Sequence, residues 1–296
     1  MATTFAATRA ADDHNNEHNN EQIRGVFNDA ASYYQNLRWF KTPLTRFEYG
    51  QTERVLLEQL RPGATDHLLE IGPGPGTWTK VVAPHVKRVT AVDISENMLE
   101  QARHYVESPN VTFINGDAAE YQPDEPLDGF YSVRVLEYVR GWERMLSRVA
   151  AHVAVGGRAT VITKTPFSVY RGTGRELSVI AVPRHLAGRL KRKLLHTPEH
   201  HITFWQTYIK PLEMAAVLRA NGFEDVEVRP VIVGLPIFMR GTCQYPIVPP
   251  PLEGAFLRAF DWGFGAATNA PTWLRDRSLF FSESYAISAT KAHDVR

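Results

Sequence analysis

Cysteine is almost missing from this sequence, which has one, Cys243, among 296 residues. A single cysteine excludes an intrachain disulfide framework and a zinc site built on several cysteines, and we expect its thiol to be a small buried apolar group. An excess of one charge is missing as well, because 33 Lys and Arg residues face 32 Asp and Glu residues. A nucleic-acid-binding protein normally carries a basic excess, so nucleic acid is disfavoured as a partner.

Long apolar runs are also missing. No stretch approaches the roughly 18 apolar residues that a membrane-spanning helix needs, and the N-terminal segment lacks the apolar core of a secretory signal. We therefore expect a cytoplasmic protein without a transmembrane segment. Residues 1–20 are polar and repetitive over much of their length. Because such a segment buries too little apolar surface to offset the entropy of ordering it, we predict a disordered tail there.

Seven short, mostly apolar runs recur along the rest of the chain and are typical of buried strands. Helical patterns separate the early runs. Ser95 can cap one helix, and a second has an apolar face from Leu146 to Val153 and stops at Gly156-Gly157. This alternation predicts an α/β fold with a seven-stranded, mostly parallel sheet and helices on both faces. The strand-like runs cover residues 67–71, 86–92, 111–114, 129–133, 159–163, 226–233 and 284–289.

Three segments interrupt this alternation and are rich in aromatic residues or in proline and glycine. Long connections inside a compact domain are usually lids, binding loops or interfaces. We therefore predict a core with helical additions. Its parts are the tail (1–20), an N-terminal helical cap (21–60), the core (61–165), a lid insertion (166–207), the continued core (208–233), a second insertion (234–281), and the last strand with a short tail (282–296).

A glycine-rich turn follows the first predicted strand, with the sequence Glu70-Ile71-Gly72-Pro73-Gly74-Pro75-Gly76. Glycine lets the backbone turn tightly and approach a ligand closely, and the helix expected to follow offers unpaired N–H groups. A tight strand-to-helix turn is the simpler alternative. The third glycine comes one residue earlier than in the G-x-G-x-x-G pattern of dinucleotide sites, which disfavours NAD.

Two carboxylates follow the next two predicted strands. Asp93 ends the second strand, where it can accept both hydroxyls of a ribose or cap the following helix. Asp117 ends the third strand, where it can accept the exocyclic amine of adenine or serve as a turn residue. Open α/β sheets bind ligands at the carboxyl ends of their strands, so we expect both acids and the glycine turn to lie at one site.

The runs LLEIGPGPG, AVDIS, FINGDA and LDGFYSVRVLEYV resemble successive motifs of the class I S-adenosylmethionine-dependent methyltransferases of the small-molecule type. The resemblance covers residues 65–165 most clearly and implies a Rossmann-like, doubly wound sheet with S-adenosyl-L-methionine as cofactor. It places Gly72, Gly74 and Gly76 against the amino-acid part of the cofactor, with Glu70 organising the loop. It also implies that Asp93 holds the ribose, that Asp117 and Ala118 hold the adenine, and that Ile94 and Met98 pack on the adenine.

Two further residues belong to the expected site. Arg134, just past the fourth strand, can bind the methionine carboxylate or an anionic substrate, or form a surface ion pair with Glu137 or Asp128. Tyr34 lies seven residues after Phe27, where related enzymes have a tyrosine that closes over the cofactor. Plain helix packing is the alternative for Tyr34.

No catalytic triad is visible, and none is required for methyl transfer to an acceptor that has no proton to lose. Where a proton must leave, His200 and His201 in the first insertion are our candidate bases, with Tyr34 as a third catalytic candidate. A solvated loop histidine is the simpler interpretation of His200 and His201, and they lack the partners of a metal site, so no metal is expected. The basic amphipathic stretch at 182–194 can contact a membrane surface weakly or form a lid helix with a solvated face.

We therefore expect a methyltransferase that acts on an oxygen or nitrogen of a small, apolar or aromatic molecule, such as a secondary metabolite or a lipid-like acceptor. Aromatic residues of the three added segments would roof the pocket. The alternatives are an RNA or protein methyltransferase and a non-catalytic regulatory protein that binds S-adenosylmethionine. Neither the acceptor nor the oligomeric state follows from the sequence. The roofing aromatics would be Phe27, Tyr34, Trp39, Phe204, Trp205, Phe238, Trp262 and Phe264.

Overall fold

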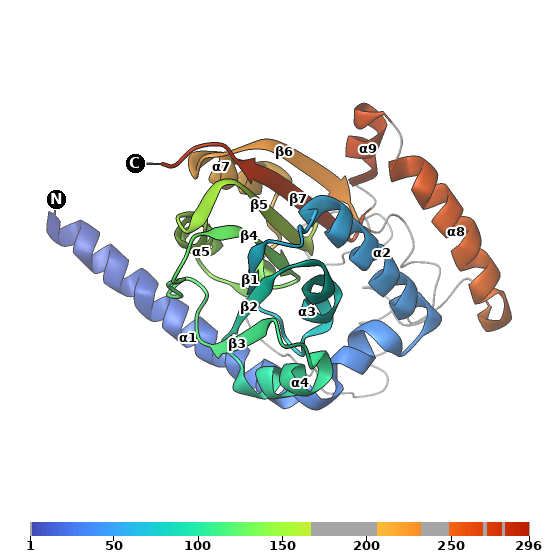
Figure 1. Ribbon diagram of the computed structural model, residues 1–296, viewed down its shortest axis with the longest axis horizontal. Coiled ribbons are helices and arrows are strands. Elements are labelled where there is room, and N and C mark those ends of the chain that lie inside the picture. Colours follow the sequence, from blue (N-terminus) through green and yellow to red (C-terminus); the bar gives the residue numbers. More distant parts are fainter. Residues whose placement is uncertain (1, 167–205, 232–248, 269–270, 280–281, 296) are drawn as a thin grey trace, which may run out of the picture.

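The computed structural model describes residues 2–166, 206–231, 249–268, 271–279 and 282–295 (Figure 1). Its seven strands are β1 (His67–Ile71), β2 (Arg88–Asp93), β3 (Val111–Asn115), β4 (Leu127–Val133), β5 (Val153–Lys164), β6 (Phe223–Pro230) and β7 (Ser284–Lys291). Its α-helices are α1 (Ala2–Gln35), α2 (Pro43–Leu60), α3 (Thr77–Val82), α4 (Glu96–Val106), α5 (Trp142–Ala150), α7 (Pro211–Ala220), α8 (Glu253–Thr268) and α9 (Thr272–Ser278). A short π-helix, η1 (Asn36–Phe40), joins α1 to α2.

The strands form one sheet in the order β3-β2-β1-β4-β5-β7-β6. Strands β1 to β5 pair in parallel, and β7 is antiparallel to both of its neighbours, β5 and β6. The predicted seven-stranded, mostly parallel sheet is therefore confirmed. Because β1 to β4 are parallel neighbours, the loops that follow them meet at one edge of the sheet.

Apolar clusters fill both faces of the sheet, as expected for a doubly wound fold. On one face, α5 and α7 bury residues such as Leu146 and Met214 against Phe130. On the other face, α2, α3 and α8 bury residues such as Leu56, Val82 and Leu257. None of the helices in the described ranges is both long and apolar enough to cross a membrane.

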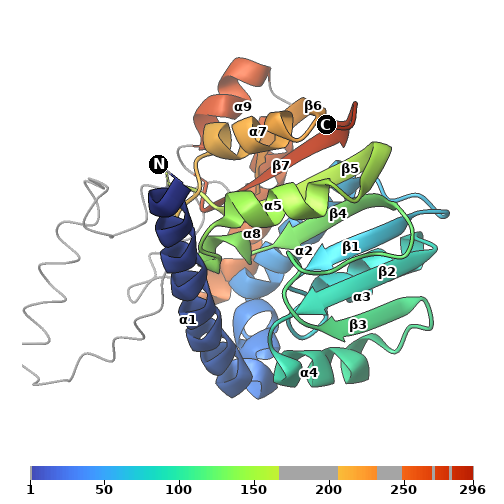
Figure 2. The same ribbon diagram turned by 90° about the vertical axis from the view of Figure 1, so that its left-hand side faces the viewer.

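Helix α1 differs from the disorder predicted for residues 1–20, since it begins at Ala2. The start of α1 is rich in alanine, the best helix former, and extending a helix beyond a docked segment costs little compared with nucleating it. Figure 1 shows the first turns of α1 extending beyond the sheet, and Figure 2 shows α1 running along the edge where the first strands end. The second half of α1 is thereby placed over the site.

A second difference concerns the segment between α5 and β5. Helix α5 ends at Ala150, so Val153 belongs to β5, and Gly156 and Gly157 lie inside that strand instead of ending the helix. Gly156 has φ +92°, and a Cβ on Gly157 would lie 2.6 Å from Val153 Cγ1. The glycines therefore permit an irregular start of β5, where its register against β4 shifts.

The two predicted insertions are described to different extents. Most of the first, together with the basic stretch at 182–194, lies outside the described residues. In the second, α8 and α9 are helical, and Leu257 of α8 is buried against the face that α2 covers. Helix α8 thus packs on α2, and α9 packs on strand β6.

Candidate active site

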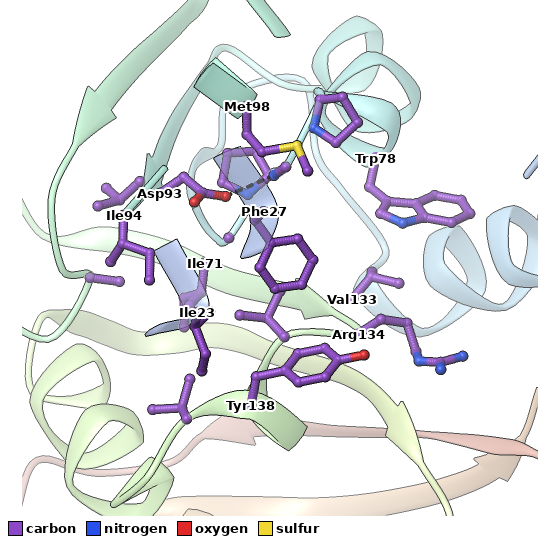
Figure 3. Close-up of a pocket in the computed structure, with 18 of the residues that line it drawn as sticks. Ile23, Phe27, Ile71, Trp78, Asp93, Ile94, Met98, Val133, Arg134 and Tyr138 are labelled. Carbon is purple, nitrogen blue, oxygen red and sulfur yellow. Dashed lines mark hydrogen bonds between the residues drawn. The ribbon is translucent and has the colours of Figure 1, made fainter. Parts of the chain in front are cut away.

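A cavity that is open to solvent lies at the carboxyl ends of β1 to β4, under α1. Its wall contains nine of the eleven residues predicted to bind the cofactor, and Figure 3 shows several of them. The sequence motifs, which are spread along the chain, therefore meet at one place. The nine residues are Tyr34, Gly72, Gly74, Asp93, Ile94, Met98, Asp117, Ala118 and Arg134.

The glycine turn has a backbone that other residues rarely adopt. Gly72, Gly74 and Gly76 have φ angles of +68°, +53° and +80°. A Cβ on Gly72 would lie 2.6 Å from Val135 Cγ2, whereas a Cβ on Gly74 would meet nothing within 4 Å. The loop at Gly74 is thus bare backbone against the cavity, a cradle suited to a ligand that approaches closely.

Gly76 does not line the cavity and has a different structural role. It directly precedes α3, and a Cβ there would lie 2.6 Å from Val106 Cγ2 in α4. Glycine at this position lets α3 and α4 approach each other. Its contribution to the site is therefore indirect.

Glu70 is also not among the residues that line the cavity. Its side chain is buried, and Oε2 accepts hydrogen bonds from Thr79 Oγ1 at 2.5 Å and from the Tyr131 hydroxyl at 2.9 Å. Burial raises the pKa of Glu70 to about 7, although both hydrogen bonds act to lower it. Glu70 thus ties the end of β1 to the first turn of α3, and so fixes both ends of the glycine turn.

Asp93 bridges two loops at the tip of β2. Its Oδ2 accepts the Gly74 N–H and its Oδ1 accepts the Ser95 N–H, each at 2.9 Å. Burial raises the pKa of Asp93, against the effect of these backbone hydrogen bonds. Ser95 is the cap of α4, because its Oγ accepts the Met98 N–H, so Asp93 is not the cap. Each carboxylate oxygen can accept a second hydrogen bond, which leaves Asp93 able to bind a diol in the cavity.

Asp117 lines the cavity at the tip of β3 and is also a turn residue. Its Oδ1 accepts the Ala119 N–H at 2.8 Å, and its Oδ2 accepts a hydrogen bond from Asn20 at 3.3 Å. The turn interpretation of Asp117 is therefore confirmed, and its binding of adenine stays a prediction. Ala118, beside it, is buried and lines the same end of the cavity.

Helix α1 contacts the segments that follow four neighbouring strands. Gln35 donates to Thr77 Oγ1 after β1, Asn28 accepts from Ser95 Oγ after β2, Asn20 donates to Asp117 after β3, and Asn19 donates to the Tyr138 carbonyl after β4. These distances are 3.2, 2.6, 3.3 and 3.1 Å. The residues from α1 thus form a clasp across the cavity.

The sequence motifs do not predict the clasp. Asn20, Ile23 and Phe27 line the cavity together with Tyr34, at intervals of three, four and seven residues. This spacing places them on one face of a helix. Extending the helical pattern backwards from Phe27 would have found Asn20 and Ile23 in spite of their polar surroundings.

Aromatic side chains line the end of the cavity near β4 and η1. The Phe27 ring contacts the rings of Tyr34 and Tyr138 edge-on, with centroid distances of 5.8 and 5.6 Å. Trp39 meets Trp78 edge-on at 4.9 Å. Burial raises the pKa of Tyr34, so its hydroxyl keeps its proton at neutral pH and acts as a hydrogen-bond donor or acceptor.

Arg134 lies at the tip of β4 and lines the cavity. Its Nε donates to Glu137 Oε1 at 2.8 Å and its Nη1 donates to Ser284 Oγ at 3.3 Å. Glu137 is fully buried and also accepts a hydrogen bond from Thr163. The surface ion pair considered from the sequence is thus a buried one. Burial acts to lower the pKa of Arg134, but Glu137 and Glu283 raise it above its ordinary value.

Of the three catalytic candidates, the structure describes only Tyr34. Tyr34 lies at the cavity, whereas His200 and His201 lie outside the described residues, as do Cys243, Phe204, Trp205 and Phe238. Trp262 was expected in the roof of the pocket, but its side chain is 81% exposed on α8, because the buried face of that helix carries Leu257 instead. Phe264 lies in α8, and its side chain is outside the described part. In the ranges that the structure describes, no three His, Cys, Asp or Glu side chains gather to hold a metal ion.

Known proteins with similar sequences are methyltransferases. The family model of a methyltransferase domain matches residues 68–157. The trans-aconitate 2-methyltransferase of Paracidovorax citrulli (strain AAC00-1) is 34% identical over 125 residues, which are 40% of this chain and 47% of that protein. The trans-aconitate 2-methyltransferase of Klebsiella pneumoniae (strain 342) is 24% identical over 192 residues, which are 61% of this chain and 74% of that protein. The chain thus spans about half the length of the first relative and about three quarters of the second.

The fold agrees as well. A solved structure of a DhpI–SAH complex aligns with a TM-score of 0.55 at 17% identity, covering 92% of this chain and 96% of that one. At this identity the likeness concerns the fold alone. The methyltransferase domain matched over residues 68–157 and the two relatives support a class I S-adenosylmethionine-dependent methyltransferase, with S-adenosylmethionine as cofactor.

Proposed function

We propose that the chain transfers the methyl group of S-adenosylmethionine to an oxygen or nitrogen of a small, apolar or aromatic molecule. One observation carries this proposal. The cavity brings together a bare glycine loop and two carboxylates from three adjacent strand ends, next to a wall of aromatic rings. The carboxylates suit a nucleoside, and the aromatic wall suits an apolar acceptor.

The order of the strands supports the assignment of cofactor parts to residues that the family resemblance implies. The strands β3, β2 and β1 lie side by side in the sheet in this order. At their ends, Asp117 and Ala118 would hold the adenine, Asp93 would hold the ribose, and Gly72 to Gly74 would hold the methionine. Ile94 and Met98 would pack on the adenine. Glu70 would act at one remove, by fixing the glycine turn.

When bound, the cofactor supplies an activated methyl group on a positively charged sulfur. The residues of the chain then have to align the acceptor with this methyl group and exclude water. The rings of Phe27, Tyr34 and Trp39 would do so, because they line the cavity under α1. The acidic lining at Asp93 and Asp117 also favours a cationic ligand.

A base is needed only where the acceptor must lose a proton. His200 and His201 are our candidates for this base. If one of them is the base, its replacement by alanine should lower kcat. Tyr34 would orient the acceptor, since its raised pKa makes it a poor base at neutral pH. Arg134 would bind the methionine carboxylate or an anionic acceptor.

Two properties of the relatives and the cavity support a small acceptor. The names of both relatives specify a small molecule, trans-aconitate. The cavity is covered by α1, so that an RNA or protein segment would have to enter beneath that helix. A cytoplasmic location stays a prediction from the sequence.

Incubating the purified protein with isotope-labelled S-adenosylmethionine and metabolite extracts tests the proposal. We expect a labelled small molecule by mass spectrometry. Label in RNA or protein would overturn the assignment of the acceptor. Tight binding of S-adenosylhomocysteine without any labelled product would instead indicate a regulatory protein.

A further inference from the structure

We propose that the methyl acceptor carries a carboxylate and that Arg134 binds this carboxylate at the end of the cavity where the methyl group is transferred. This inference rests on the proposed function, because it names the class of small molecule that the same cavity accepts. It makes Arg134 a residue that determines acceptor specificity.

The position of Arg134 follows from the order of the strands. Neighbouring strands lie about 4.8 Å apart, and the loops after β3, β2 and β1 carry Asp117, Asp93 and the glycine turn. The next strand in the sheet is β4, and Arg134 follows its last residue. Figure 3 shows Asp93 and Ile94 on one side of the cavity and Trp78 and Arg134 on the other. Arg134 thus lies one strand beyond the loop assigned to methionine, where the acceptor meets the methyl group.

The guanidinium of Arg134 has donors to spare. A guanidinium has five N–H groups, of which Nε uses one on Glu137 and Nη1 uses one on Ser284. Its Nη2 makes no hydrogen bond to any residue within the described ranges, and the Arg134 side chain, which lines the cavity, keeps 10% of its surface exposed. The free edge can therefore receive two oxygens of a carboxylate in the paired geometry that arginine favours.

The backbone of Arg134 is held in a strained conformation. Its φ angle is +64°, and the left-handed region costs a residue with a Cβ roughly 1 kcal/mol. A 2.7 Å hydrogen bond from its N–H to the Ile162 carbonyl and the two side-chain bonds maintain this conformation. Strain of this kind persists at sites where a side chain must be presented to a ligand.

Glu137 orients the guanidinium. Its carboxylate is fully buried, with Oε1 on Arg134 and Oε2 on Thr163 Oγ1, both at 2.8 Å. It thereby fixes the Nε edge of the guanidinium. Of the charged side chains that line the cavity, the other two, Asp93 and Asp117, are acidic. An anionic acceptor group therefore has Arg134 as its cationic partner in the described wall.

The flanking groups define the rest of the acceptor. Trp78 and Tyr138 line the cavity with Arg134 (Figure 3), and flat rings favour contact with a planar apolar body. A small aromatic or unsaturated acid has both a carboxylate for Arg134 and a planar apolar body for the rings. Its carboxylate would also be attracted by the positive sulfur of the bound cofactor.

Isothermal titration calorimetry of the full chain saturated with S-adenosylhomocysteine tests the inference. The probes are a panel of small aromatic and unsaturated acids, among them 4-hydroxybenzoate and trans-aconitate, and the matching neutral amides. We expect at least one acid to bind at least tenfold more tightly than its amide. In Arg134→Gln this preference should disappear, while the affinity for S-adenosylhomocysteine stays within twofold. Failure of every acid to bind better than its amide would overturn the inference.

A loss of affinity for S-adenosylhomocysteine in Arg134→Gln, with unchanged affinity for 5′-methylthioadenosine, would also overturn it. That result would assign Arg134 to the methionine carboxylate, which only the first compound has. Because Arg134→Gln leaves Glu137 buried and unpaired, the double variant Arg134→Gln/Glu137→Gln provides a folded control. Failure of the proposed function looks different: acids bind in an Arg134-dependent manner, but no labelled methyl group reaches any acceptor.

Discussion

The Gly74 N–H donates to Asp93 Oδ2 at 2.9 Å, so that the glycine turn after β1 and the carboxylate at the tip of β2 form one unit. A loop that must let a ligand approach closely cannot be held by bulky side chains. Asp93 holds it through the backbone instead. The same carboxylate therefore shapes the loop and faces the cavity, which makes it the first residue to test.

Asp93→Ala should lower the affinity for S-adenosylhomocysteine by at least tenfold, because it removes both the acceptor of the Gly74 N–H and the proposed ribose ligand. Asp93→Asn keeps one side-chain oxygen and should lower this affinity less than Asp93→Ala does. Calorimetric titration of both variants measures the effect, with circular dichroism to check the fold. Unchanged affinity in Asp93→Ala would refute the assignment to ribose.

Glu70 makes stability depend on pH. Burial raises its pKa from 4.5 to about 7. The free energy of unfolding is therefore highest below about pH 4.5, where the carboxyl group is protonated in both states, and it falls as the pH rises through 7. Glu70→Gln keeps an oxygen for Thr79 and Tyr131 and does not ionise. Relative to this variant, the wild type should lose up to about 3 kcal/mol of unfolding free energy between pH 4.5 and 7.5. Urea unfolding at several pH values measures the difference, and a constant difference would contradict the prediction.

Gly72 and Gly74 are a matched pair for the glycine turn. Both have positive φ angles, but only a Cβ on Gly72 would clash, with Val135. We expect Gly74→Ala to cost about 1 kcal/mol from backbone strain alone, and Gly72→Ala to cost clearly more. Urea denaturation compares the two. Gly72→Ala/Val135→Ala should recover part of the loss, and no recovery would argue against the clash.

The clasp of α1 should slow the release of the cofactor. Asn28→Ala removes the 2.6 Å hydrogen bond to Ser95, which is worth about 1 kcal/mol. We therefore expect the dissociation rate of S-adenosylhomocysteine to rise a few-fold in stopped-flow measurements. Arg24→Ala, on the exposed side of the same helix, serves as the control and should leave the rate unchanged. Equal rates in both variants would mean that α1 does not restrain the cofactor.

The sheet could be predicted from the sequence because its strands are short apolar runs with glycine or acidic ends. Asp93 and Asp117 mark such ends, and parallel pairing forces them to one edge. The motif residues Gly72 and Gly74 were found for the same reason. Local sequence and global topology agree at these positions.

The clasp and the Arg134 network could not be predicted in this way. Asn19 and Asn20 lie in a polar stretch that is typical of disorder, and they are ordered by partners more than 90 residues away in the chain. Ser284, which binds Arg134, is 150 residues distant. Contacts of this range arise from tertiary packing and leave no local pattern. The local signs of α1 are the helical pattern predicted from residue 21 onward and the spacing of Asn20, Ile23 and Phe27.

Strand β7 is the last of the seven along the chain but lies between β5 and β6 in the sheet. A ribosome makes β6 well before β7, so during synthesis β6 has no neighbouring strand to join. Strands β1 to β5 meet no such delay, and they include every strand whose tip lines the cavity. The cofactor-binding half can therefore assemble on the nascent chain, while β6 stays an unpaired edge, open to chaperones and to aggregation, until the final strand emerges.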